Sequence, residues 1–120
     1  MRELRIAAVN LSILLLDLVR DTVRAHGPAR IVCATDSPID LEQCIERHHP
    51  DVVLVGFDGA AELVEVTRTL RRRHPALRLV GIECSGRRMV RLTEAGPDLD
   101  RSEELTTECL RVALLDAAHG

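Results

Sequence analysis

Short apolar runs alternate with amphipathic segments along this chain, and this alternation predicts strands that are each followed by a helix. Residues 5–9 and 52–55 are apolar runs too brief for helices, and the second has no polar alternation, as in a parallel strand covered on both faces. Residues 30–34 and 78–82 have the same character. We therefore predict four buried strands at these positions.

The segments between these runs place apolar residues on one helical face and carry helix start and stop signals. Ser12 and Asp40 can serve as N-caps, and Gly27-Pro28, Pro50 and Pro75 follow the ends of the helical patterns. Five helices are predicted. The first begins after Ser12, and the second begins after Asp40 and ends before Pro50. The other three cover residues 61–73, residues 87–94 and the segment from Ser102 to Leu115.

Strands that alternate with helices imply right-handed crossovers and an α/β fold. The leading prediction is a flavodoxin-like, doubly wound parallel sheet of five strands in the order 2-1-3-4-5, with any site at the carboxyl ends of strands one and three. The fifth strand would have to come from residues 97–101, which are polar and begin with proline. We expect it to be short or frayed.

Length and composition indicate one globular domain over residues 1–120. Hydrophobic residues make up 46% of the chain and charged residues 29%, and the net charge of -3 gives no general attraction to nucleic acid or to an anionic membrane. Phe57 is the one aromatic residue, so a base-stacking surface is excluded. The apolar run of residues 11–18 is too short to span a bilayer, and a cytoplasmic location is expected.

Neither the cysteines nor the histidines have the spacing of a metal or redox motif. The cysteines lack CxxC spacing and are expected to be free core thiols, and His48 and His49 fit a helix end better than a metal site. Residues 9–12 contain no glycine, which argues against a dinucleotide. No cofactor and no metal are expected. The cysteines are Cys33, Cys44, Cys84 and Cys109.

Two phrases in the sequence resemble recurring phrases of the bacterial response-regulator receiver family. They are residues 50–55, Pro-Asp-Val-Val-Leu-Val, and residues 93–98, Thr-Glu-Ala-Gly-Pro-Asp. The whole chain is similar to that family in the order and length of its segments. The resemblance implies the flavodoxin-like fold and a phosphorylation pocket, and the pocket positions can be compared residue by residue.

The resemblance places unsuitable residues at most positions of this pocket. The positions of the metal-binding acidic pair look like Asn10 and Leu11, and the phosphorylated aspartate is replaced by Gly56. Glu83 lies where the family has a hydroxyl, and Arg101 is the nearest candidate for the family's lysine. Because Mg²⁺ prefers carboxylate oxygens and phosphorylation needs a nucleophile, we predict neither in this degenerate pocket.

Asp58 lies two residues past the acceptor position and could point into the same pocket. Its alternative role is in a turn, because Asp58-Gly59 is a typical turn pair. Phosphorylation at Asp58 therefore stays open as a secondary hypothesis.

The leading functional hypothesis is a non-enzymatic pseudo-receiver, a regulatory module of two-component type that binds a protein partner or a second copy. The resemblance implies a contact face between the fourth and fifth helices of the family. The alternative is the receiver-like part of a transcription regulator, switched by a small ligand or at Asp58, with no direct contact to nucleic acid or membrane. The residues expected on the contact face are Arg87, Arg88, Arg91, Leu99 and Arg101.

Overall fold

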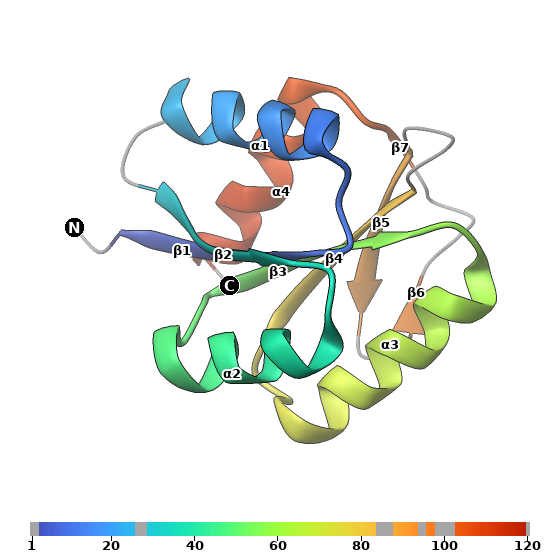
Figure 1. The fold of residues 1–120 in the computed structure, drawn as a ribbon. Coiled ribbons are helices and arrows are strands. Elements are labelled where there is room, and N and C mark those ends of the chain that lie inside the picture. The colour runs from blue at the N-terminus through green and yellow to red at the C-terminus, as the bar shows by residue number, and fades with distance from the viewer. Residues whose placement is uncertain (1–2, 26–28, 84–87, 94–95, 98–102, 120) are drawn as a thin grey trace.

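A computed structural model of the chain describes residues 3–25, 29–83, 88–93, 96–97 and 103–119. Strands and helices alternate through the first two thirds of the chain (Figure 1). The strands are β1 (Leu4–Val9), β2 (Ala29–Thr35), β3 (Val52–Phe57), β4 (Arg78–Glu83), β5 (Arg88–Thr93), β6 (Gly96–Pro97) and β7 (Glu103–Glu104), and the helices are α1 (Ile13–Ala25), α2 (Pro38–His48), α3 (Ala60–Arg73) and α4 (Thr107–His119).

The strands form one sheet in the order β2-β1-β3-β4-β5-β6, and β7 also pairs with β5. The first four strands in this order are parallel. The predicted α/β class and the strand order 2-1-3-4-5 are therefore confirmed. The fifth strand is short, but it is antiparallel to β4 and comes from residues 88–93 rather than from residues 97–101.

The helix predicted over residues 87–94 is wrong, because residues 88–93 form β5. Met89 and Val90 are adjacent and both buried, yet they pack into the cores on opposite faces of the sheet. Successive residues point to opposite faces only in a strand. A short or absent fifth strand would leave the fourth strand less well covered, but residues 79–83 of β4 pair with β5 on that side.

Helices cover both faces of the sheet and divide the interior into two cores. Figure 1 shows α1 and α4 on one face and α2 and α3 on the other. Within β3, Val52 and Leu54 pack with α1 and α4, whereas Val53 and Val55 pack under α2 and α3. This two-sided burial explains why β3 has no polar alternation. Within the described ranges, no helix is long and apolar enough to cross a membrane.

A pair of hydrogen bonds fixes β3 beside β1 where β3 begins. The backbone N–H of Arg5 donates to Asp51 Oδ2 at 2.9 Å, and the N–H of Asp51 donates to the carbonyl of Arg5 at 2.8 Å. Both bonds join residues 46 positions apart in the chain. Asp51, which belongs to the first family-like phrase, therefore has a structural role in setting the register of the two central strands.

Two helices begin at residues other than those predicted. Ser37, not Asp40, is the N-cap of α2: its hydroxyl accepts a hydrogen bond from the N–H of Asp40, and proline follows at the first helical position. Helix α4 begins at Thr107, after Thr106, whose hydroxyl accepts from the N–H of Cys109. Ser102, the predicted cap of the last helix, lies outside the described residues.

Candidate functional site

The carboxyl ends of β1 and β3 meet at Asn10 and Gly56, as the sequence predicts. Asn10 follows β1 in the left-handed region with φ of 62°, a conformation that asparagine adopts more readily than most residues. Its N–H donates to the carbonyl of Thr35 at 2.8 Å, and its Nδ2 donates to the carbonyl of Gly56 at 3.3 Å. The loop after β1 is therefore tied to both neighbouring strands.

Gly56 is required by space, because the backbone of Asn10 fills the position that a side chain would need. A Cβ atom on Gly56 would lie 2.1 Å from the carbonyl oxygen of Asn10 and 2.7 Å from its carbonyl carbon. Real Cβ atoms essentially never approach within 3.0 Å of another heavy atom. A side chain at the acceptor position of the resemblance would therefore require the backbone of Asn10 to move.

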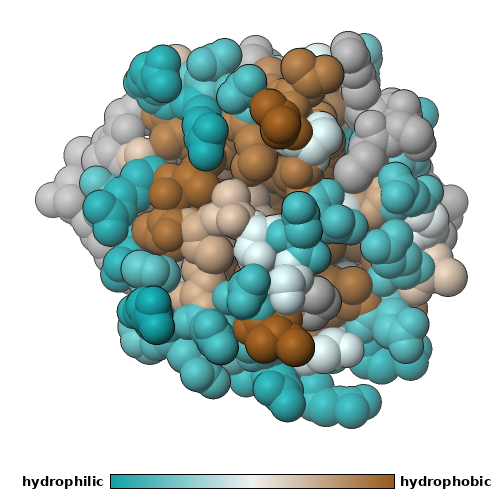
Figure 2. Space-filling model, in the orientation of Figure 1, coloured by the Kyte–Doolittle hydropathy of each residue, from teal (hydrophilic) through white to brown (hydrophobic). Residues whose placement is uncertain are grey.

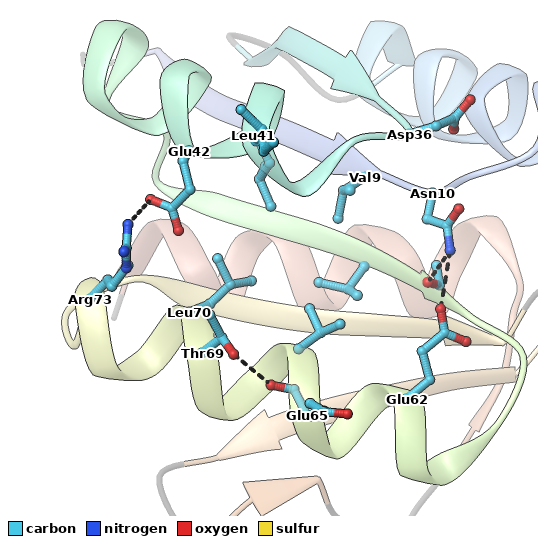
Figure 3. A pocket seen from close by; sticks show the side chains of 14 residues that line it. Val9, Asn10, Asp36, Leu41, Glu42, Glu62, Glu65, Thr69, Leu70 and Arg73 are labelled. Carbon is cyan, nitrogen blue, oxygen red and sulfur yellow. Dashed lines mark hydrogen bonds and ion pairs between the residues drawn. The ribbon is translucent and has the colours of Figure 1, made fainter.

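Glu62, in the first turn of α3, completes this junction and was missed in the sequence. Its carboxylate accepts a hydrogen bond from Asn10 Nδ2 at 3.4 Å (Figure 3). It also accepts one from the N–H of Asp58 at 3.3 Å. Gly59 is the N-cap of α3, so Glu62 holds the third helical position, where glutamate commonly binds back to the preceding turn. The spacing of three residues between Gly59 and Glu62 is the sequence signal that could have identified this role. We call Asn10, Gly56 and Glu62 the crevice.

Of the other predicted pocket residues, the three that the structure describes do not join the crevice as a reactive set. Leu11 is buried in the core under α1, and Glu83 is half-buried at the end of β4, where it lies in register with Phe57. Asp58 is exposed in the turn before α3, and its connection to the crevice is through its backbone N–H. Arg101 lies outside the described residues.

Beside the crevice, a cavity of about 500 Å³ lies between α2 and α3 above the ends of β1 and β3. We call it the α2–α3 cavity. Its surface is mostly apolar, and Ile39, at the start of α2, is 72% exposed beside it. Figure 3 shows the side chains that line it. The apolar lining residues are Val9, Ile39, Leu41, Val55, Val66 and Leu70.

A charged cluster joins α2 to α3 at the end of the cavity farther from the crevice. Glu42 on α2 lies 3.8 Å from Arg73, the last residue of α3 (Figure 3). It also lies 2.9 Å from Nε2 of His74, the C-cap of α3. Asp36, Glu62 and Glu65 supply the remaining carboxylates of the cavity lining. At the far end of the cavity, the positive charge of Arg73 is therefore close to the carboxylate of Glu42. The end beside the crevice is acidic.

The predicted contact face is described only in part. Arg88 is exposed on β5 and Arg91 lies on the same strand, whereas Arg87, Leu99 and Arg101 lie outside the described residues. Because residues 88–93 are a strand, the described part of this face consists of β5 and α4 rather than two helices.

The cysteine and histidine side chains form no reactive centre among the described residues. Cys44 is buried, and this burial, together with a hydrogen bond that its thiol donates to Cys33, raises the pKa of the Cys44 thiol to about 12. Such a thiol is protonated at neutral pH and is a poor nucleophile. His49 ends α2 in a left-handed conformation, and its N–H donates to Ile45. In these ranges no group of three metal-ligating side chains occurs.

Comparison with solved structures shows that the chain has the receiver-domain fold. One similar structure is the RcsB response regulator of Salmonella typhimurium, solved in a study of conformational dynamism for DNA interaction; it has a TM-score of 0.58 and 9% identity, and the match covers 71% of this chain and 43% of that one. Another is the isolated receiver domain of RcsB from Salmonella enterica serovar Typhimurium with the phosphomimetic BeF3⁻, with a TM-score of 0.58 and 10% identity, covering 98% and 73% of the two chains.

These similarities concern the fold alone, because identity is so low. The chain spans less than half of the RcsB chain in the first structure. No protein-family model matches the sequence, and no curated protein sequence is similar to it.

Proposed function

We propose that this domain is a receiver-like regulatory module that acts by contact with a protein partner or a second copy, without catalysis and without an aspartyl phosphate. The observation that carries the proposal is the carbonyl oxygen of Asn10, which lies 2.1 Å from the place that the Cβ atom of a phosphorylatable residue at position 56 would take. The fold supports a signalling role, and the crevice argues against the chemistry that the family resemblance implies.

The crevice also offers poor conditions for Mg²⁺ and for phosphate. The amide of Asn10 already directs its Nδ2 to Glu62, and its neutral carbonyl is a weak substitute for the carboxylates that Mg²⁺ prefers. Leu11 is buried and has no ligand atom. The carboxylate of Glu62 would repel a phosphoryl group at this position. We therefore expect the crevice to provide neither the bound Mg²⁺ nor the nucleophile that metal-assisted phosphoryl transfer requires.

We expect no Mg²⁺ binding and no response to phosphate analogues. Calorimetry with millimolar Mg²⁺ should give no heat of binding, and beryllofluoride should leave the amide NMR spectrum unchanged. Incubation with acetyl phosphate should leave the mass of the intact protein unaltered. A phosphoryl adduct that is present in the wild type and absent in Asp58→Asn would instead support phosphorylation at Asp58, which is exposed in its turn.

Exposed aliphatic side chains mark where a protein partner could bind. Ile13 and Leu14, in the first turn of α1, are 78% and 76% exposed. Figure 2 shows brown side chains over the start of α1. Large aliphatic side chains that lie together on a surface are typical of contact sites. This site is on the same face of the sheet as α4, which forms part of the contact face predicted from the sequence.

We expect the protein to self-associate or to bind a partner, and two substitutions distinguish the possible surfaces. Leu14→Asp places a charge at the start of α1, and Leu99→Asp tests the face predicted from the sequence. Light scattering at tens of micromolar should show an assembly that one of them separates, while circular dichroism stays unchanged. A wild-type protein that is monomeric, and that recovers no partner in a pull-down from its own cells, would contradict the proposed function.

A second candidate function is regulation by a small ligand. The α2–α3 cavity favours it, because its volume falls in the range of about 300–1,000 Å³ that small-molecule sites occupy.

A further inference from the structure

We propose that the α2–α3 cavity binds an amphipathic organic cation, a compound with an aliphatic body and a protonated amine. The assignment rests on the second candidate function, regulation by a small ligand. The cavity lies at the carboxyl ends of β1 and β3, where one strand leads outward to β2 and the other to β4. Ligands of open α/β sheets bind at this reversal of strand order, because the connecting loops separate there.

The lining fits an apolar body. Val9 and Val55 form the sheet side of the cavity, while Leu41 on α2 and Leu70 on α3 form its walls (Figure 3). The exposed side chain of Ile39 lies at the same site. A bound aliphatic chain would cover this side chain and remove apolar surface from water, which stabilises the complex.

The charges of the lining select a cation rather than an anion. The guanidinium of Arg73 lies 3.8 Å from Glu42, so this cation is largely neutralised at the far end. At the crevice end, Glu62 and Glu65 are carboxylates one helical turn apart on α3. Glu62 also accepts two hydrogen bonds at the start of α3, where a bound anion would otherwise be favoured. An ammonium group is therefore expected beside Glu62.

Three probes of equal chain length test the assignment: hexylammonium, 1-hexanol and hexanoate, each titrated into the ¹⁵N-labelled protein. Hexylammonium should give saturable shifts at Asn10, Gly56 and residues 62–70. Hexanol should bind more weakly, and hexanoate should give no saturable shift. Hexanoate binding as tightly as hexylammonium would overturn the cation assignment, and no saturable shift with any of the three probes would overturn the site.

Two variants and a matched control locate the binding. Val66→Phe should fill the cavity and weaken hexylammonium at least tenfold, whereas Val64→Phe, on the same helix but not in the lining, should leave affinity unchanged. Glu62→Gln keeps the acceptor oxygen and removes the charge, so affinity should fall about fivefold, the equivalent of about 1 kcal/mol. If Val66→Phe abolishes binding but Glu62→Gln has no effect, the ligand site stands and the cation assignment fails. Equal binding to all variants would overturn both.

Discussion

Gly56→Ala should destabilise the domain by about 3 kcal/mol or more, the upper end of the effects of overpacking a core. The added methyl carbon would lie 2.1 Å from the carbonyl oxygen of Asn10, so β1 and β3 would have to separate where they join. The loop of Asn10 cannot easily move, because its N–H is bonded to Thr35 and its side chain to Gly56 and Glu62. Urea unfolding followed by circular dichroism measures the effect.

Two other glycines of the chain provide controls for this substitution. A Cβ on Gly81 would meet the side-chain ends of Leu63 and Phe57 at 3.1 to 3.3 Å, and these can shift slightly, so Gly81→Ala should cost clearly less. Gly59→Ala meets no steric obstacle, because nothing lies within 4 Å of the added atom, and should cost only the roughly 1 kcal/mol by which alanine is a poorer N-cap. A loss at Gly56 no greater than at Gly81 would contradict the steric argument.

The same contact predicts the outcome of an attempt to restore the family's aspartate. Gly56→Asp would add the clash of Gly56→Ala and introduce a carboxylate at a buried position of β3. Fold loss, rather than phosphorylation, is the expected result. The aspartate could return only together with a different course of the chain after β1.

Leu110→Ala should be the second large effect, a loss of about 2–5 kcal/mol in the free energy of unfolding. Leu110 on α4 is 0% exposed and belongs to the core shared by α1 and the sheet. Val112 on the same helix is 36% exposed, so Val112→Ala is a control that should cost much less. Thermal and urea unfolding measure both. Equal losses would mean that α4 presents another face to the sheet.

The order of the elements could be predicted from the sequence because the central strands are covered on both faces. An uninterrupted apolar run such as residues 52–55 has few alternatives to a buried parallel strand. The inner face of the last helix was predicted less well. In the predicted helix from Ser102 to Leu115, the apolar pattern is Leu105, Cys109, Val112 and Leu115. Leu105 is buried and Cys109 packs partly buried against the same core, but Val112 is exposed, and Leu110, Ala113 and Leu114 are the buried residues described on α4. Its start was placed at Ser102 instead of Thr107, and that shifted the expected face.

The strand at residues 88–93 was missed because its sequence, Arg-Met-Val-Arg-Leu-Thr, is compatible with one and a half helical turns as well as with a short strand. Burial on both sides distinguishes these possibilities, and burial depends on what packs around the segment. The resemblance to the receiver family also favoured a helix there. The local sequence and the family resemblance therefore both favoured a helix, whereas packing in the folded domain places a strand there.

The sequence predicted which residues lie at the site, but not the close contact between their backbones. Asn10 and Gly56 were placed together through the order of strands, and the structure confirms that they meet. The steric exclusion depends on the left-handed conformation of Asn10, which no local pattern specifies. The α2–α3 cavity depends on how far two helices stand apart, and that separation is set by side chains from both helices and from the sheet.

The antiparallel β5 has a consequence for how the domain folds. β4 and β5 pair from Glu83 with Arg88 outward, so their contacts are local in sequence, whereas β1 and β3 must bring together residues 46 positions apart. Hairpins form within about 1–10 μs, and closing a longer loop carries a larger entropic cost. β4 and β5 can therefore pair early and independently of the first half of the chain. The parallel strands would then add to an existing edge, and the rate of folding would depend on how quickly β3 finds β1.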